Sequence, residues 1–129
     1  MHNIFKMIIF FSIGAILYPI LEILFRGYSH WSMSIAGGLS FLFICEVNRL
    51  MPNSSIWLKC LIGAAAITVI EFITGYIVNI QLNMGVWDYS HMPLNLMGQI
   101  CLPFTVLWFF LCIPAYGLGN IVGKLLDKI

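Results

Sequence analysis

The sequence predicts an all-α integral membrane protein that folds as one four-helix bundle. Of its 129 residues, 61% are hydrophobic and only 9% are charged, whereas a typical soluble domain is about 45–50% apolar and about 25% charged. Four mainly apolar stretches are long enough to cross a bilayer, which takes roughly 20 residues of helix. They lack the alternating pattern, about ten residues per strand, of an outer-membrane barrel. Helices are therefore predicted, because a helix satisfies its own backbone hydrogen bonds in lipid.

The four predicted spans make up one transmembrane domain over residues 1–129. The connections are short except after the third span, so consecutive helices are expected to lie antiparallel and side by side. The first span is too long for a signal peptide and lacks a cleavage site, so we expect it to be retained. The predicted spans are residues 4–26, 31–50, 56–80 and 98–119, the last with an apolar continuation to Leu126.

The Lys and Arg residues beside the spans predict which side of the membrane each end faces. Cytoplasmic loops of membrane proteins carry an excess of these residues. If the N-terminus is inside, only Arg26 lies outside. The others then lie on the cytoplasmic side: Lys6, Arg49, Lys59, Lys124 and Lys128. Both termini are therefore predicted to be cytoplasmic in a cell (inner or plasma) membrane, with the loop at residues 81–97 outside.

Three glutamates fall inside the predicted spans, where a charge at the bilayer centre costs about 3 kcal/mol. Glu22 precedes Arg26 by four residues and Glu46 precedes Arg49 by three, so each is expected to pair with its neighbour near a membrane surface. Alternatively, Glu22 and Arg26 line an outward-facing cavity. Glu71 has no base within one turn and lies nine residues before the end of its span. At about 1.5 Å per residue, that places it about 13 Å deep.

Helical spacing places Glu71 on one stripe of the third span with Thr68, Gly75 and Asn79. Three interpretations of Glu71 stay open at this point. It is a protonated side chain that hydrogen-bonds across helices, a proton carrier or cation ligand in transport or gating, or a purely structural partner of Arg26.

The outer loop, residues 81–97, is both polar and aromatic. Trp87 and Tyr89 are typical of membrane interfaces, and Asp88 begins a predicted turn. We expect the loop to fold back onto the outer mouth of the bundle, either as a lid over a ligand or as an interfacial cap without one. Loop and spans together provide the predicted ligand-binding residues: Glu71, Arg26, Glu22, Asn79, Trp87, Asp88, Tyr89, Asn95 and Gln99.

No cofactor, metal site or catalytic site is predicted. The four cysteines are scattered through the spans without a Cys-x-x-Cys pair, and the three histidines lack metal-ligand spacing. A membrane enzyme that acts on lipids through Asp88 and His91 is the weakest functional alternative. Triad-type residues so close together in one loop seldom reach the geometry of a catalytic triad.

Several motifs in the second half of the chain together resemble those of a known family. They are Glu71-Phe-Ile-Thr-Gly75, Trp87-Asp-Tyr-Ser90, Asn95, Gly98-Gln-Ile-Cys-Leu102 and Trp108. The set resembles the CmpB-like family of small bacterial multi-pass membrane proteins, named as ABC-transporter permeases, and is similar to animal transmembrane proteins that share the domain. The resemblance covers residues 70–108, while the Asn-Arg-Gly and Gly-Pro motifs of several bacterial members are missing. It implies a role in transport, although the chain has no Walker A motif.

The expected function is that of a small permease-like or transport-associated protein with an outward-facing polar pocket. Glu71 would bind a cation or proton there, and Arg26 would hold Glu71 or an anionic group. The alternative is a non-transporting accessory, assembly or lipid-headgroup-binding subunit. The expected partners are membrane lipids, a small cation or amphiphilic ligand, and a second copy or larger membrane protein, since four helices rarely enclose a pathway. A net charge of +1 excludes nucleic-acid binding.

Overall fold

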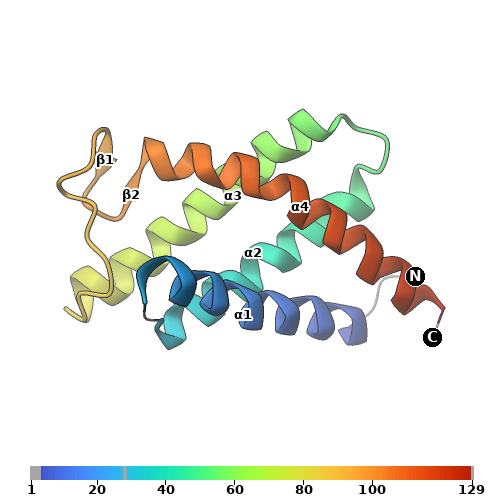
Figure 1. The fold of residues 1–129 in the computed structure, drawn as a ribbon, viewed down its shortest axis with the longest axis horizontal. Helices are drawn as coiled ribbons and strands as arrows, with labels where there is room; N and C mark the ends of the chain where they lie inside the picture. Colours follow the sequence, from blue (N-terminus) through green and yellow to red (C-terminus); the bar gives the residue numbers. More distant parts are fainter. Residues whose placement is uncertain (1–3, 28, 129) are drawn as a thin grey trace.

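The structure, a computed structural model, describes residues 4–27 and 29–128, without the side chains of Phe25 and Arg26. Its α-helices are α1 (Ile4–Arg26), α2 (Trp31–Leu50), α3 (Ile56–Gly75) and α4 (Leu102–Asp127) (Figure 1). A short π-helix, η1 (Tyr76–Gln81), continues α3, and two short strands, β1 (Asn95–Leu96) and β2 (Ile100–Cys101), precede α4. Four helices, with η1 counted as part of α3, are long and apolar enough to cross a membrane. The predicted all-α four-helix membrane fold is confirmed.

Helix α2 is the centre of the bundle. It packs against α1, α3 and α4, whereas α1 packs mainly on α2 and touches α4 only slightly. An ion pair between Lys6 and Asp127 joins the first turn of α1 to the last turn of α4. These two turns therefore share one end of the bundle, the terminal end, and residues 82–101 lie at the opposite end, the loop end (Figure 1). The side of the membrane that each end faces stays a prediction.

Glycines let α1 and α2 approach each other closely. A Cβ atom on Gly14 would lie 2.3 Å from the carbonyl oxygen of Gly37, and one on Gly37 would lie 2.4 Å from Cβ of Tyr18. Membrane helices commonly associate through small residues in this way. The face of α1 that carries Tyr18, and Glu22 one turn later, consequently borders the interior of the bundle.

The fourth helix begins at Leu102 rather than at the predicted Gly98, and it includes the predicted apolar continuation to Leu126, ending at Asp127. Ahead of it, β1 and β2 pair in an antiparallel hairpin. Met97 and Gly98 in its turn have φ angles of 56° and 73°, a left-handed conformation that no helix start allows. The helix starts only after this turn, where a proline suits its first residues. At the C-terminal end the apolar residues continue past residue 119, and the helix continues with them.

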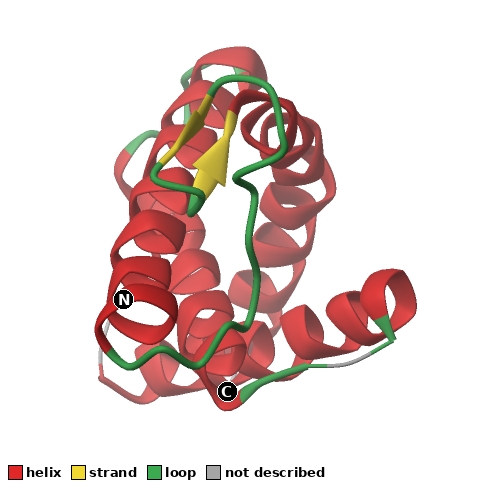
Figure 2. Ribbon diagram, turned by 90° about the vertical axis from the view of Figure 1, so that its left-hand side faces the viewer, coloured by secondary structure: helices red, strands yellow, loops and turns green. Residues whose placement is uncertain are grey.

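The long loop after η1 covers the loop end of the bundle. Its residues Val86, Trp87 and Tyr89 are buried, and they belong to one apolar cluster with Met33 of α2 and Val78 of η1. Figure 2 looks at this end of the molecule, with the two strands and the loop in front of the helices. The loop thus folds back onto the bundle, as the sequence predicted.

Candidate functional site

A cavity of about 350 Å³, partly open to the surface of the bundle, lies between the helices. All four helices line it, and Trp87 and Tyr89 of the loop form part of its wall. Most of the lining is aliphatic or aromatic, as is usual for a ligand-binding cavity. Two carboxyl groups depart from this pattern, because Glu22 of α1 and Glu71 of α3 border the cavity and are only 6% and 8% exposed. These two acids define the candidate site.

Glu71 makes hydrogen bonds to two other segments of the chain. The indole N–H of Trp108 on α4 donates to Oε1 over 3.3 Å, and the hydroxyl of Tyr89 in the loop lies 3.3 Å from Oε2. Because an indole N–H can only donate, Oε1 is an acceptor in either protonation state. A hydroxyl can donate to a carboxylate or accept from a protonated carboxyl. These two contacts are therefore compatible with either charge state of Glu71.

Glu22 approaches the same part of the cavity from α1. It shares a side-chain hydrogen bond with Tyr18, and Tyr18 also interacts electrostatically with Glu71 and Tyr89. The ring of Tyr18 meets that of Trp108 edge to face, with the ring centres 5.8 Å apart. Tyr18 thus lies between the two acids and links α1 to the Glu71 side of the cavity.

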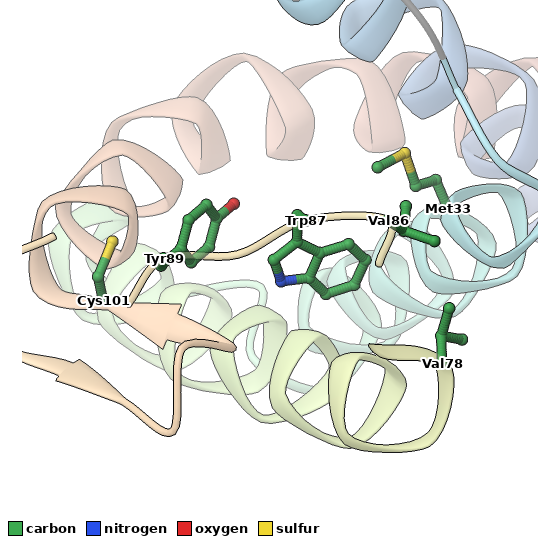
Figure 3. Close-up of a cluster of buried hydrophobic side chains, with 6 residues drawn as sticks. All are labelled: Met33, Val78, Val86, Trp87, Tyr89 and Cys101. Atoms are coloured by element: carbon green, nitrogen blue, oxygen red, sulfur yellow. The ribbon is translucent and has the colours of Figure 1, made fainter. Parts of the chain in front are cut away.

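The loop contributes aromatic rings to the cavity wall. Tyr89 stacks on Phe104 of α4, with ring centres 4.8 Å apart and planes 12° from parallel. The indole N–H of Trp87 donates to the backbone carbonyl of Gln99 over 3.0 Å. Figure 3 shows both side chains extending from the loop in the space between the helices. Their rings are fixed in place, so the cavity wall is preformed.

Asn79 and Gln99, both predicted to bind a ligand, hold the loop in position. Asn79 Oδ1 accepts from the backbone N–H groups of Val86 and Trp87 over 2.6 and 3.4 Å, and its Nδ2 donates to Gln99 Oε1 over 2.8 Å. A Cβ atom on Gly75 would lie 2.6 Å from that same Oε1 atom. The predicted stripe of α3 and η1 does share one face, and its part at the loop end anchors the loop that carries Trp87.

Asp88 and Asn95, also in the predicted set, shape the exposed part of the loop. Asp88 Oδ1 accepts from the backbone N–H of Ser90 over 2.9 Å, and Asn95 donates to the carbonyl of Met92 over 2.9 Å. Hydrogen bonds from the backbone and then the side chain of Ser90 hold the pKa of Asp88 below its ordinary value. Asp88 is exposed, and neither residue belongs to the cavity lining.

The predicted ion pairs have different outcomes. Arg49 donates to Glu46 Oε2 over 2.8 Å, which confirms the pair at the terminal end. The side chain of Arg26 lies outside the described part of the chain, so its pairing with Glu22 or Glu71 stays a prediction.

Two side chains outside the predicted ligand-binding set are central to the site. The helical spacing of the sequence does place Tyr18 one turn before Glu22 on the same face of α1. Trp108 contacts Glu71 across 37 residues of sequence, and no local spacing indicates such a contact. In the sequence, only the family resemblance identifies Trp108.

The fold and the site define a class of protein: a multi-pass α-helical membrane protein with two buried acids beside a cavity between its helices. A family model described as "Putative ABC-transporter type IV" (CmpB) matches residues 20–128, and the chain belongs to this family. The match extends well beyond residues 70–108, which carry the resemblance seen in the sequence. No solved structure matches the chain significantly. Family and fold together make this a transport-associated membrane protein.

Proposed function

We propose that this protein is permease-like and that its cavity binds a cation or a proton at Glu71. The observation that supports this most is a carboxyl group, 8% exposed, that borders a cavity of about 350 Å³. Ionisable side chains inside membrane spans are costly, and those that face a cavity mark ion and substrate pathways. Glu22 borders the same cavity and adds a second acid.

The proposed orientation has the loop end outside and both termini in the cytoplasm. It is supported by the Lys and Arg residues, five of which are predicted to lie at the terminal side and one at the loop side. In this orientation the cavity takes its ligand from the outer side of a cell membrane. Arg26 follows Glu22 by one turn and would balance its charge there. A second copy or a larger membrane partner would complete the pathway, because four helices rarely enclose one.

A non-transporting accessory or lipid-headgroup-binding subunit is the second candidate. It is favoured by the two hydrogen bonds of Glu71, which join α3, α4 and the loop. In this role Glu71 holds the cap on the bundle, and no ligand has to enter the cavity.

A flux assay separates the two candidates. The protein is reconstituted in liposomes, and proton movement is followed with an internal pH-sensitive dye under an imposed membrane potential. We expect flux with the wild type and its loss with Glu71→Gln, because the amide cannot carry charge. Glu46→Gln is the matched control, since Glu46 pairs with Arg49 at the other end of the bundle.

The flux assay can contradict the proposal in two ways. Equal flux for Glu71→Gln and the wild type would rule out transport through Glu71. A folded wild type that shows no flux and co-purifies with a larger membrane protein would favour the accessory role.

A further inference from the structure

Several aromatic side chains lie beside the two buried acids of the cavity. We propose that the ligand of this cavity is a hydrophobic organic cation, with an ammonium head and an apolar body. This inference rests on the proposed function, which makes the cavity a cation site, and it names the chemical class of the cation.

Five aromatic residues border the cavity: Tyr18 from α1, Phe41 from α2, Trp87 and Tyr89 from the loop, and Trp108 from α4. Three of them are tied to the acids, because Tyr89 and Trp108 hydrogen-bond to Glu71 and Tyr18 hydrogen-bonds to Glu22. The faces of aromatic rings attract cations, and cages of such rings recognise quaternary ammonium groups. Rings and carboxyls therefore surround the space that an ammonium head would occupy.

The same walls are a poor coordination shell for a bare inorganic ion. The oxygen atoms that the side chains offer come from Tyr18, Glu22, Ser40, Glu71 and Tyr89. Ca²⁺ and Mg²⁺ are bound mainly by carboxylates, carbonyl oxygens and water, whereas three of these five side chains offer only a hydroxyl. In the described part of the chain, no three His, Cys, Asp or Glu side chains gather closely enough to hold a metal ion. An ammonium head with apolar substituents loses less hydration energy than a bare inorganic ion does when it enters the cavity. It also matches a lining that is mostly carbon.

The rest of the cavity suits an apolar body. Away from the acids it is lined by Ile44 of α2, Ile67 of α3, and Leu111 and Leu118 of α4. Cavities of about 300–1,000 Å³ hold small organic ligands, and this one measures about 350 Å³. A ligand with a charged head and an apolar body therefore matches the cavity along its length.

Binding of benzyltrimethylammonium to the purified full-length protein tests the inference. Its neutral carbon isostere, neopentylbenzene, has the same shape without the charge, and K⁺ has the charge without the apolar body. Binding is measured by calorimetry and by tryptophan fluorescence, since Trp87 and Trp108 line the cavity. We expect saturable binding of the organic cation, at least about tenfold weaker binding of the isostere, and no saturable response to K⁺.

Matched variants locate the binding. Tyr18→Leu removes a ring and should weaken binding by about 2- to 30-fold, the range of a cation–π contact. Tyr18→Phe keeps the ring and should bind more tightly than Tyr18→Leu. Tyr76→Leu removes a ring outside the cavity lining and should bind as the wild type does. Glu71→Gln should abolish binding, and if it fails to fold, Glu22→Gln should weaken it.

Each other outcome overturns a defined part of the account. Equal binding of the isostere would show an apolar cavity without charge recognition. A Glu71-dependent response to K⁺ or protons alone would refute the organic-cation inference and leave the proposed function standing. The absence of any cation or proton response, in a folded protein, would refute both.

Discussion

At the scale of single residues, the chemistry of the candidate site depends on the hydrogen bonds of Glu71. Its two carboxyl oxygens contact one donor from α4 and one hydroxyl from the loop, each over 3.3 Å. The indole N–H can only donate, but the hydroxyl can donate or accept. These two contacts are therefore compatible with a proton or a negative charge on Glu71. A purely structural glutamate needs no such tolerance, whereas one that exchanges a proton or a cation does.

Trp108→Phe tests this arrangement, because it keeps an aromatic ring and removes the indole N–H. Glu71 then loses the indole donor, and the loss of a hydrogen bond to a buried carboxyl group costs about 1–3 kcal/mol. We expect the free energy of unfolding in detergent to fall by that amount. Trp31→Phe is the control, since Trp31 is 55% exposed. Equal stability of the two variants would show that the Trp108–Glu71 hydrogen bond contributes nothing.

Sequence alone could identify the acids but not the role of every polar neighbour. Glu22 and Glu71 stood out because charge inside a span is rare, and both border the cavity. Asn79 and Gln99 stood out as polar side chains within the predicted spans, yet they hydrogen-bond to each other beside the loop. Polarity at membrane depth indicates that a side chain needs a partner. Whether the partner is a ligand or the backbone depends on contacts between distant segments, such as Trp108 with Glu71.

At the scale of elements, η1 and the loop act as one unit. The π-helix ends α3 and includes Asn79, whose amide holds two backbone N–H groups of the loop. Single-turn π-helices occur frequently at functional sites. Here η1 sets the position of Trp87, and through it one wall of the cavity.

Asn79→Ala should loosen this unit without unfolding the helices. The variant loses the acceptor for Val86 and Trp87 and the donor to Gln99. We expect faster hydrogen exchange at residues 82–101, by roughly 5- to 150-fold for about 1–3 kcal/mol of lost local stability. Gln81→Ala, at an exposed position of the same π-helix, should leave exchange unchanged. Unchanged exchange in Asn79→Ala would mean that packing alone holds the loop.

The elements also show which boundaries a sequence can predict. The bounds of the first two predicted spans match α1 and α2, because apolar runs end there at a charged residue or just before a turn. The start of α4 was misplaced because Met97 and Gly98 adopt left-handed angles in a hairpin. That hairpin forms against the loop, with Tyr89 N–H donating to the carbonyl of Gly98 over 2.7 Å. A contact of this kind, between residues that are not neighbours in the sequence, leaves no pattern that would predict where the helix begins.

At the scale of the whole molecule, the uneven packing of the helices creates the site. α2 contacts every other helix, while α1 barely touches α4. The cavity occupies the space between α1 and the α3–α4 pair, and the loop closes part of one end. Buried acids at the loop end and ion pairs at the terminal end give the molecule two chemically different ends. Such asymmetry suits a protein that takes a ligand from one side of a membrane.

The most direct test of the central claim, that a cation binds at Glu71, is an infrared difference spectrum of the protein in lipid. The spectrum is recorded with and without benzyltrimethylammonium, and again across a pH step. We predict carboxyl bands that change on cation addition or on the pH step, disappear in Glu71→Gln, and persist in Glu46→Gln. The same carboxyl bands in Glu71→Gln as in the wild type would contradict the account.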